Sequence, residues 1–188
     1  MPTPTNPGKP VRSPRASLTV HDEKEYVESQ RRENLVEHTM LSELLQDAWL
    51  RRQQPLDVLR GEVDASGYDL ARVCNGFTRH VQTKSSKKPS KTAVHGGNGR
   101  LADMASGCVI WATVEEERAS NRVVLHYRRF GDKPGEALPT LGNRKMRKPR
   151  ARGENAFRAN TFRVTKGRFI PVGNIAELSD RIFGPPDG

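Results

Sequence analysis

Three polar residues, Asp69, Gln82 and Lys84, stand in a segment that otherwise has the pattern of two short strands, GYDLARVCNGFTRHVQTKSS (residues 67–86). A carboxylate and an amide oxygen are ligands that a hard divalent cation such as Mg²⁺ accepts. A lysine ammonium beside them could hold an attacking water or offset the negative charge that builds on a phosphate. These side-chain types indicate metal-assisted chemistry on a phosphate ester, provided that the fold brings them together.

The turn between the two strands predicts which residues face each other. Asn75-Gly76 is the strongest short-range signal for a two-residue type I′ turn, so the residues that flank it are expected to pair. Every later pair then has residue numbers with the same sum, which places Asp69 opposite Gln82 with Cβ atoms about 4.5–5.5 Å apart. Lys84 follows two residues later and projects from the same face. A β-bulge would shift this register and separate the three groups.

A metal site would gain from a second carboxylate. The preceding helix offers Glu37 and Glu43, and Glu62 and Asp64 lie just upstream of the hairpin. The competing interpretation is that the polar residues form the solvated side of an antiparallel sheet. His80 lies on the same predicted face and is expected to be a partly exposed strand residue rather than a base.

A long helix is predicted ahead of the hairpin, over about residues 25–52, and Pro55 ends it. Its apolar positions have the spacing of one buried stripe, formed by Leu41, Leu44, Leu45, Ala48 and Trp49. Both tryptophans, in this stripe and at Trp111, are expected in the core. The two cysteines, Cys74 and Cys108, are expected to be buried reduced thiols.

Further strands are predicted at residues 56–63, 107–114, 122–130 and, as a strand pair or one bent strand, 161–172. The run 107–114 is apolar enough for burial on both faces. Two loops are expected, a flexible basic one that contains Gly96, Gly97 and Gly99, and a long one over residues 131–160.

Asn174 is expected to cap a closing helix. Its apolar face would consist of Ile175, Leu178, Ile182 and Phe183. One helix, several strands and a closing helix predict an α/β or α+β domain on a mixed sheet.

The chain is strongly basic, with 32 Lys and Arg residues against 22 Asp and Glu and a formal net charge of +10. Such a balance suggests a polyanion partner, and the clustering of the charge favours nucleic acid. The charge gathers in two clusters, one over residues 144–168 and one formed by Lys84, Lys87, Lys88 and Lys91. A solvated basic loop is the alternative interpretation of either cluster. The residues expected to contact nucleic acid are Lys87, Lys88, Lys91, Arg144, Lys145, Arg147, Lys148, Arg150 and Arg152.

Residues 1–20 hold five prolines among Thr, Ser, Lys and Arg and are expected to be a disordered basic tail. Residues 21–188 are long enough for one domain with its own core. The apolar runs are far shorter than a membrane span, and no leader opens the chain. A soluble, cytoplasmic protein without a membrane partner is the expectation.

A helix, then GYD on one strand and QTK on the next, resembles the PD-(D/E)xK nuclease superfamily. The Gln-x-Lys form is similar to that of Mrr-type restriction endonucleases and of uncharacterised bacterial relatives with a GYDL…HxQxKSS-like stretch. The resemblance runs from about Glu37 to Gly184. It implies one restriction-endonuclease-like domain over residues 21–188, with a mixed central sheet flanked by helices.

The resemblance also implies roles for individual residues. Asp69 would be the metal-binding carboxylate, Lys84 the catalytic lysine, and Gln82 would replace the usual Glu or Asp as second ligand to Mg²⁺ or Mn²⁺. Glu43 would be the preferred helix carboxylate, with Glu37 second. A neutral amide binds Mg²⁺ less well than a carboxylate, so Gln82 is where the chain departs from the superfamily pattern.

Three functions stay open at this point. The first is a metal-dependent endonuclease that cuts phosphodiester bonds in DNA, with the arginine-rich loop that begins at Arg144 binding the DNA backbone. The second is a catalytically silent relative that binds nucleic acid or a protein partner. The third is a structural or regulatory protein without affinity for nucleic acid. Related nucleases often cut two strands as dimers, so a homodimer is also considered.

Overall fold

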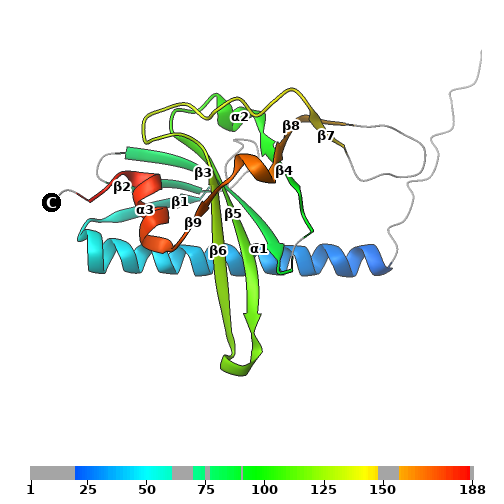
Figure 1. The fold of residues 1–188 in the computed structure, drawn as a ribbon, viewed down its shortest axis with the longest axis horizontal. Helices are drawn as coiled ribbons and strands as arrows, with labels where there is room; N and C mark the ends of the chain where they lie inside the picture. The colour runs from blue at the N-terminus through cyan, green and yellow to red at the C-terminus, as the bar shows by residue number, and fades with distance from the viewer. Residues whose placement is uncertain (1–19, 61–69, 75–76, 90, 148–156, 187–188) are drawn as a thin grey trace, which may run out of the picture.

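A mixed sheet forms the centre of the computed structural model, which describes residues 20–60, 70–74, 77–89, 91–147 and 157–186 (Figure 1). In spatial order its strands are β1 (Leu56–Arg60), β2 (Leu70–Cys74), β3 (Phe77–Lys87), β5 (Gly107–Glu117), β6 (Arg122–Phe130) and β9 (Ile170–Val172). β3 and β5 run parallel, and the other neighbours run antiparallel. The α+β architecture and the mixed sheet are therefore confirmed.

A smaller antiparallel sheet lies beside the main one (Figure 1). In spatial order it contains β4 (Val94–Asn98), β8 (Phe157–Thr165) and β7 (Lys145–Arg147). The helices are α1 (Val20–Asp47) with its π-helical continuation η1 (Ala48–Arg52), α2 (Gly99–Ala102), α3 (Ile175–Phe183) and the 3₁₀ turns η2 (Arg118–Ser120) and η3 (Lys166–Arg168). Figure 1 shows the β5–β6 hairpin projecting beyond α1.

α1 packs on one face of the main sheet together with α3. Its fully buried residues are Val36, Met40 and Leu44, spaced by four residues, and they share a core cluster with Val81 of β3 and Ile110 of β5. The helix ends near Pro55 as predicted, because Gln53 adopts a left-handed conformation with φ 52°. Within the described part of the chain, no helix combines the length and apolar character needed to cross a membrane.

The predicted buried stripe of α1 is only half right. Leu44 and Ala48 are buried, whereas the side chains of Leu45 and Trp49 are 42% and 81% exposed. Successive positions on a helix are about 100° apart, so the sheet covers Leu44 but not Leu45. The placement of Trp49 in the core is wrong, and its ring instead borders an apolar surface groove with Leu41 and Leu45.

β5 is buried on both faces, as predicted for residues 107–114. Cys108, Ile110 and Ala112 face the helices, and Val109 and Trp111 face the smaller sheet. Trp111 is 1% exposed, and the thiol of Cys108 is buried and reduced, so both expectations are confirmed. The side chain of Cys74 lies outside the described residues. β6 pairs antiparallel with β5 over its whole length.

Two predicted loops contain strands. The glycine-rich stretch expected to be flexible forms β4, because its glycines allow close approach of neighbours: a Cβ on Gly96 would lie 2.6 Å from Thr161 Cγ2, and one on Gly97 would lie 2.7 Å from Leu141 Cδ2. The long loop expected over residues 131–160 includes β7 and the first residues of β8. The expected tail lies outside the described residues, apart from Val20.

The closing helix α3 agrees with its prediction. Asn174 Oδ1 accepts a hydrogen bond of 2.9 Å from the backbone N–H of Glu177, which satisfies one of the N–H groups at the helix start. Leu178, Ile182 and Phe183 are buried against the sheet, and Ile175 is partly buried.

The two tryptophans should differ sharply in their contribution to stability. Trp111→Ala removes a buried ring and should lower the free energy of unfolding by about 3–5 kcal/mol. Trp49→Ala changes an exposed side chain and should stay within about 0.5 kcal/mol of the parent. Denaturant unfolding followed by circular dichroism measures both. Equal losses for the two variants would contradict the packing of α1 described above.

Candidate functional site

The β2–β3 hairpin has the register that its turn predicts. The pairs run from Cys74↔Phe77 through Arg72↔Arg79 to Leu70↔Val81, without a bulge. The turn residues Asn75 and Gly76 lie outside the described residues, as does Asp69, the next residue upstream of β2. The described ladder therefore confirms the predicted register, and the pairing of Asp69 with Gln82 stays a prediction.

Gln82 and Lys84 project from the same face of β3. Their parallel partners on β5 are Val109 and Trp111, and both partners belong to the core between the main sheet and the smaller sheet. Gln82 is only 6% exposed. Its Oε1 accepts a hydrogen bond of 3.1 Å from the backbone N–H of Asn98, at the end of β4. β4 thus covers the face from which Gln82 and Lys84 project.

A chain of hydrogen bonds continues along this face. Trp111 Nε1 donates to Ser86 Oγ over 2.8 Å, and Ser86 Oγ lies 3.1 Å from Thr113 Oγ1. Lys166 of η3 lies above the Trp111 ring, with its Nζ 5.7 Å from the ring centroid. Buried polar groups are tolerated where they are hydrogen-bonded, so this chain allows a polar layer to lie beside the apolar cluster that contains Val109 and Trp111.

His95 is the residue of this layer that the sequence did not single out. Its ring packs edge-on against Trp111, with centroids 4.4 Å apart, and its buried Nε2 has no hydrogen-bond partner among the described residues. Burial, and then the nearby Lys84 ammonium, lower the pKa of His95 to about 4. The imidazole is therefore neutral at pH 7, and Lys84 carries positive charge beside it.

His80 behaves as the sequence predicted for a strand residue. It lies two residues before Gln82 on β3, so it projects from the same face, and it is half-buried. Its Nδ1 lies 3.1 Å from the carbonyl oxygen of Ala105, to which an Nδ1–H would donate. The ring is thus held by the backbone of the segment before β5.

Glu43, the preferred helix carboxylate, does not join Gln82 and Lys84. Its Oε2 accepts a hydrogen bond of 2.8 Å from the Tyr127 hydroxyl, and Tyr127 belongs to the core on the α1 side of the sheet. α1 carries Glu37 on the same side of the sheet. Since successive strand residues alternate between faces, a residue that packs with Val81 cannot share the face of Gln82. Glu62 and Asp64 lie outside the described residues.

The donor set fits a metal ion only in part. The described residues contain no group of three or more His, Cys, Asp and Glu side chains placed to hold a metal. Gln82 supplies a hard oxygen, but the bond from Asn98 takes one of the two acceptor positions that an amide oxygen offers. A carboxylate ligand would have to come from outside the described residues, where the candidates Asp69, Glu62 and Asp64 lie.

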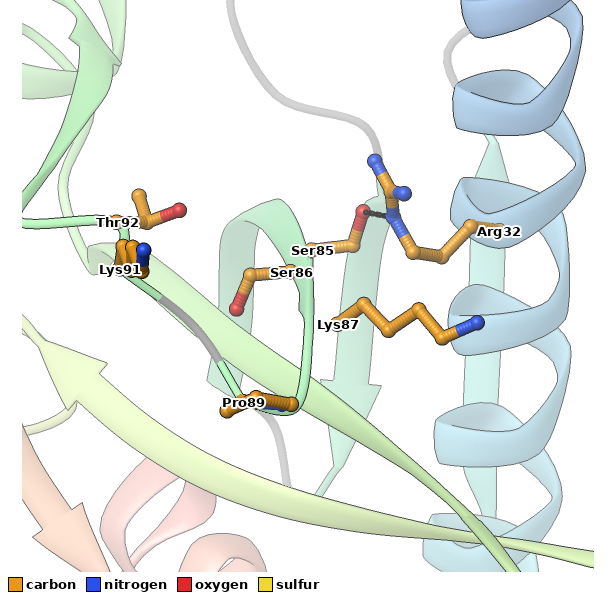
Figure 2. Close-up of a pocket in the computed structure, with 7 residues that line it drawn as sticks. All are labelled: Arg32, Ser85, Ser86, Lys87, Pro89, Lys91 and Thr92. Carbon is orange, nitrogen blue, oxygen red and sulfur yellow. Dashed lines mark hydrogen bonds between the residues drawn. The ribbon is translucent and has the colours of Figure 1, made fainter.

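The basic residues predicted to contact nucleic acid fall into three groups. Lys87 and Lys91 line a pocket to which Arg32 of α1 also contributes (Figure 2). Lys88 instead forms an ion pair of 2.7 Å with Glu115. In the arginine-rich segment Arg144 and Lys145 are exposed, and only the backbone of Arg147 is described. Lys148, Arg150 and Arg152 lie outside the described residues.

Arg32 was missed because its role depends on where α1 crosses β3. The sequence places it in a helix with alternating charge, a pattern typical of a solvated face. In the structure its Nε donates to Ser85 Oγ over 3.3 Å, and Ser85 lies on β3, 53 residues later in the chain. No local signal predicts such a contact.

The neutral state of His95 should make stability depend on pH. The folded pKa lies below the unfolded value of 6.5, so protonation favours the unfolded chain. His95→Phe should abolish a loss of stability that develops as pH falls from about 6.5 towards 4, with a slope of at most about 1.4 kcal/mol per pH unit. Urea unfolding across this range measures the difference. His38→Gln, which changes an exposed histidine of α1, is the matched control. An unchanged pH profile in His95→Phe would contradict the buried, neutral state of His95.

The chain has no match among protein-family models, curated proteins or solved structures. The function must therefore be argued from the chain's own residues. Two features of the described structure are suited to binding or catalysis: the hairpin face with Gln82 and Lys84, and the basic pocket beside it.

Proposed function

We propose that the chain is a PD-(D/E)xK-like endonuclease that binds DNA and hydrolyses phosphodiester bonds at Asp69, Gln82 and Lys84. The observation that carries this proposal is the bulge-free register of the hairpin from Cys74↔Phe77 to Leu70↔Val81. That ladder is the one required for Asp69 to face Gln82. Lys84 then lies on the same face as Gln82, two residues along β3.

Lys84 is the cation of the proposed site. Neutral His95 beside it cannot compensate its charge, and partial enclosure by β4 lowers the effective dielectric, so its ammonium should interact strongly with a phosphate. A fixed positive charge is most useful in hydrolysis where negative charge builds on the phosphate oxygens. Gln82, held by the N–H of Asn98, would orient the hairpin's polar groups around that phosphate.

A divalent ion, Mg²⁺ or Mn²⁺, would be held by Asp69 with the amide oxygen of Gln82, and when bound would supply charge neutralisation and an activated water. The other two requirements, affinity for a polyanion and a positive charge at the reacting phosphate, would be met by the chain's own residues. Its net charge of +10 favours association with a polyanion, and Lys84 supplies the fixed charge at the hairpin.

Cleavage of supercoiled plasmid tests the proposal. The parent protein should nick or linearise plasmid in Mg²⁺ or Mn²⁺ and not in EDTA. Asp69→Ala and Lys84→Ala should each lower the rate by about 10²-fold or more, because each removes a charge that acts on the reacting phosphate. Gel electrophoresis of the plasmid forms measures the rate.

Two exposed residues provide matched controls for these variants. Asp57→Ala removes a carboxylate from β1, and Lys88→Ala removes an ammonium just beyond β3. Both should cut at the parental rate. Cleavage that survives Lys84→Ala would remove Lys84 from the chemistry, even if the protein proves to be a nuclease.

A second function, nucleic-acid binding without cleavage, is favoured by one specific observation. The residue in the position of the usual second acid is a neutral amide whose oxygen already accepts a backbone hydrogen bond. Glu43, which could have supplied another carboxylate, is bonded to Tyr127 on the opposite face. A protein of this kind would retard DNA on a gel at low salt and leave it uncut in every metal.

Gln82→Glu separates the two functions. The substitution keeps the length of the side chain and an oxygen that can accept from Asn98, and adds the negative charge that Mg²⁺ prefers. If the hairpin is an active site, the Mg²⁺ concentration for half-maximal cleavage should fall by about tenfold, the effect of about 1.4 kcal/mol of added binding. A metal titration measures it. Parent and variant that both bind DNA and both fail to cut would support the binding protein.

A further inference from the structure

A basic pocket of about 400 Å³ opens where α1 passes the end of β3 (Figure 2). Arg32 reaches into it from the helix, Ser85 and Lys87 line it from the strand, and Lys91 and Thr92 close it from the segment that leads to β4. Figure 2 shows Arg32 and Ser85 on one side of this space and Lys91 and Thr92 on the other. These residues come from three separate parts of the fold.

The pocket concentrates positive charge. Three of its lining side chains are cationic and none is acidic. Lys87 is paired with Glu116 over 2.5 Å, so its charge is largely compensated from outside the pocket. In the described part of the chain, no carboxylate lies within ion-pair distance of Arg32 or Lys91. These two cations therefore dominate the potential inside.

Arg32 is also held in a fixed orientation. Its Nε donates to Ser85 Oγ over 3.3 Å and its Nη2 donates to Ser29 Oγ over 3.2 Å. Hydroxyl groups fix a guanidinium without neutralising it, so less side-chain entropy remains to be lost when an anion binds. A fixed guanidinium, an ammonium and hydroxyl groups around one small space form a donor set suited to a phosphate.

The pocket and Lys84 lie on the same strand. Lys84 and Lys87 are three residues apart, which is about 10 Å along β3. Ser85 projects from the α1 face, whereas Gln82 and Lys84 project from the other. Ser85 and Ser86 are successive residues of β3 that project from opposite faces, and both line the pocket. A ligand in the pocket could therefore contact side chains from both faces of the strand.

We propose that this pocket binds a backbone phosphate of the DNA strand that passes Lys84, within about three nucleotides of the phosphate at that lysine. The proposal rests on the proposed function, because it takes nucleic acid as the ligand, but it does not require cleavage. It assigns a binding role to Arg32, Ser85 and Lys91 in the positioning of substrate, and gives Lys88 none.

Four charge-removing variants test the pocket. Arg32→Gln and Lys91→Gln change residues that line the pocket. Arg31→Gln, at the preceding helix position, and Lys88→Gln, at a lysine paired with Glu115, change residues outside it. All four change the net charge equally, so long-range attraction changes alike. Binding of a fluorescein-labelled DNA duplex is measured by anisotropy in EDTA over a salt series, which removes any dependence on metal or cleavage. Circular dichroism verifies that each variant is folded.

The pocket variants should bind about tenfold more weakly than the parent, and the slope of log affinity against log salt should become shallower by about 0.9 for the lost phosphate contact. The control variants should remain close to the parent. Equal losses in all four variants, with the parent binding normally, would overturn the pocket and leave the proposed function standing. A parent protein that binds no DNA at low salt would overturn both.

Discussion

The parallel pairing of β3 with β5 is the constraint on which the rest of the structure depends. Eight residue pairs join the two strands, from His80↔Gly107 to Lys87↔Val114. Parallel neighbours cannot be joined by a tight turn, so the chain must cross from one end of the sheet to the other. That crossover contains β4 and α2, and β4 lies over Gln82 with the N–H of Asn98 bonded to its side chain. The enclosure of the candidate site is thus a consequence of strand order.

The same pairing obliges β5 to be apolar on both faces. Ile110 packs towards α1 and α3, while Trp111 packs towards His95 and Phe169. The second face nevertheless carries polar groups from β3, and their energetic penalty is reduced by bonds to β5: Ser86 Oγ accepts from Trp111 Nε1 and lies within hydrogen-bond distance of Thr113 Oγ1. A polar layer that is internally bonded can therefore remain buried beside the apolar cluster that contains Val109 and Trp111.

What the sequence could predict was local. The hairpin register follows from one turn, the burial of β5 from one apolar run, and the start of α3 from the cap at Asn174. What it could not predict depended on which surfaces meet. Trp49 is exposed because the sheet covers the adjacent arc of α1, and Glu43 bonds to Tyr127 because α1 lies on the face opposite Gln82. Helical periodicity alone does not specify how wide an arc the sheet will cover.

The charges of the described site bear on how it would meet its ligands. Gln82 is neutral, His95 is neutral at pH 7 because its pKa is lowered to about 4, and Lys84 and Lys166 are cations near the same tryptophan ring. Such a surface attracts a phosphate more strongly than a free divalent cation. Mg²⁺ is commonly bound through one or two carboxylates together with phosphate oxygens of the substrate. A neutral amide in place of an acid would therefore shift the site towards a metal that arrives with the nucleic acid. Binding of DNA, to which the pocket at Arg32 would contribute, would then precede binding of the metal.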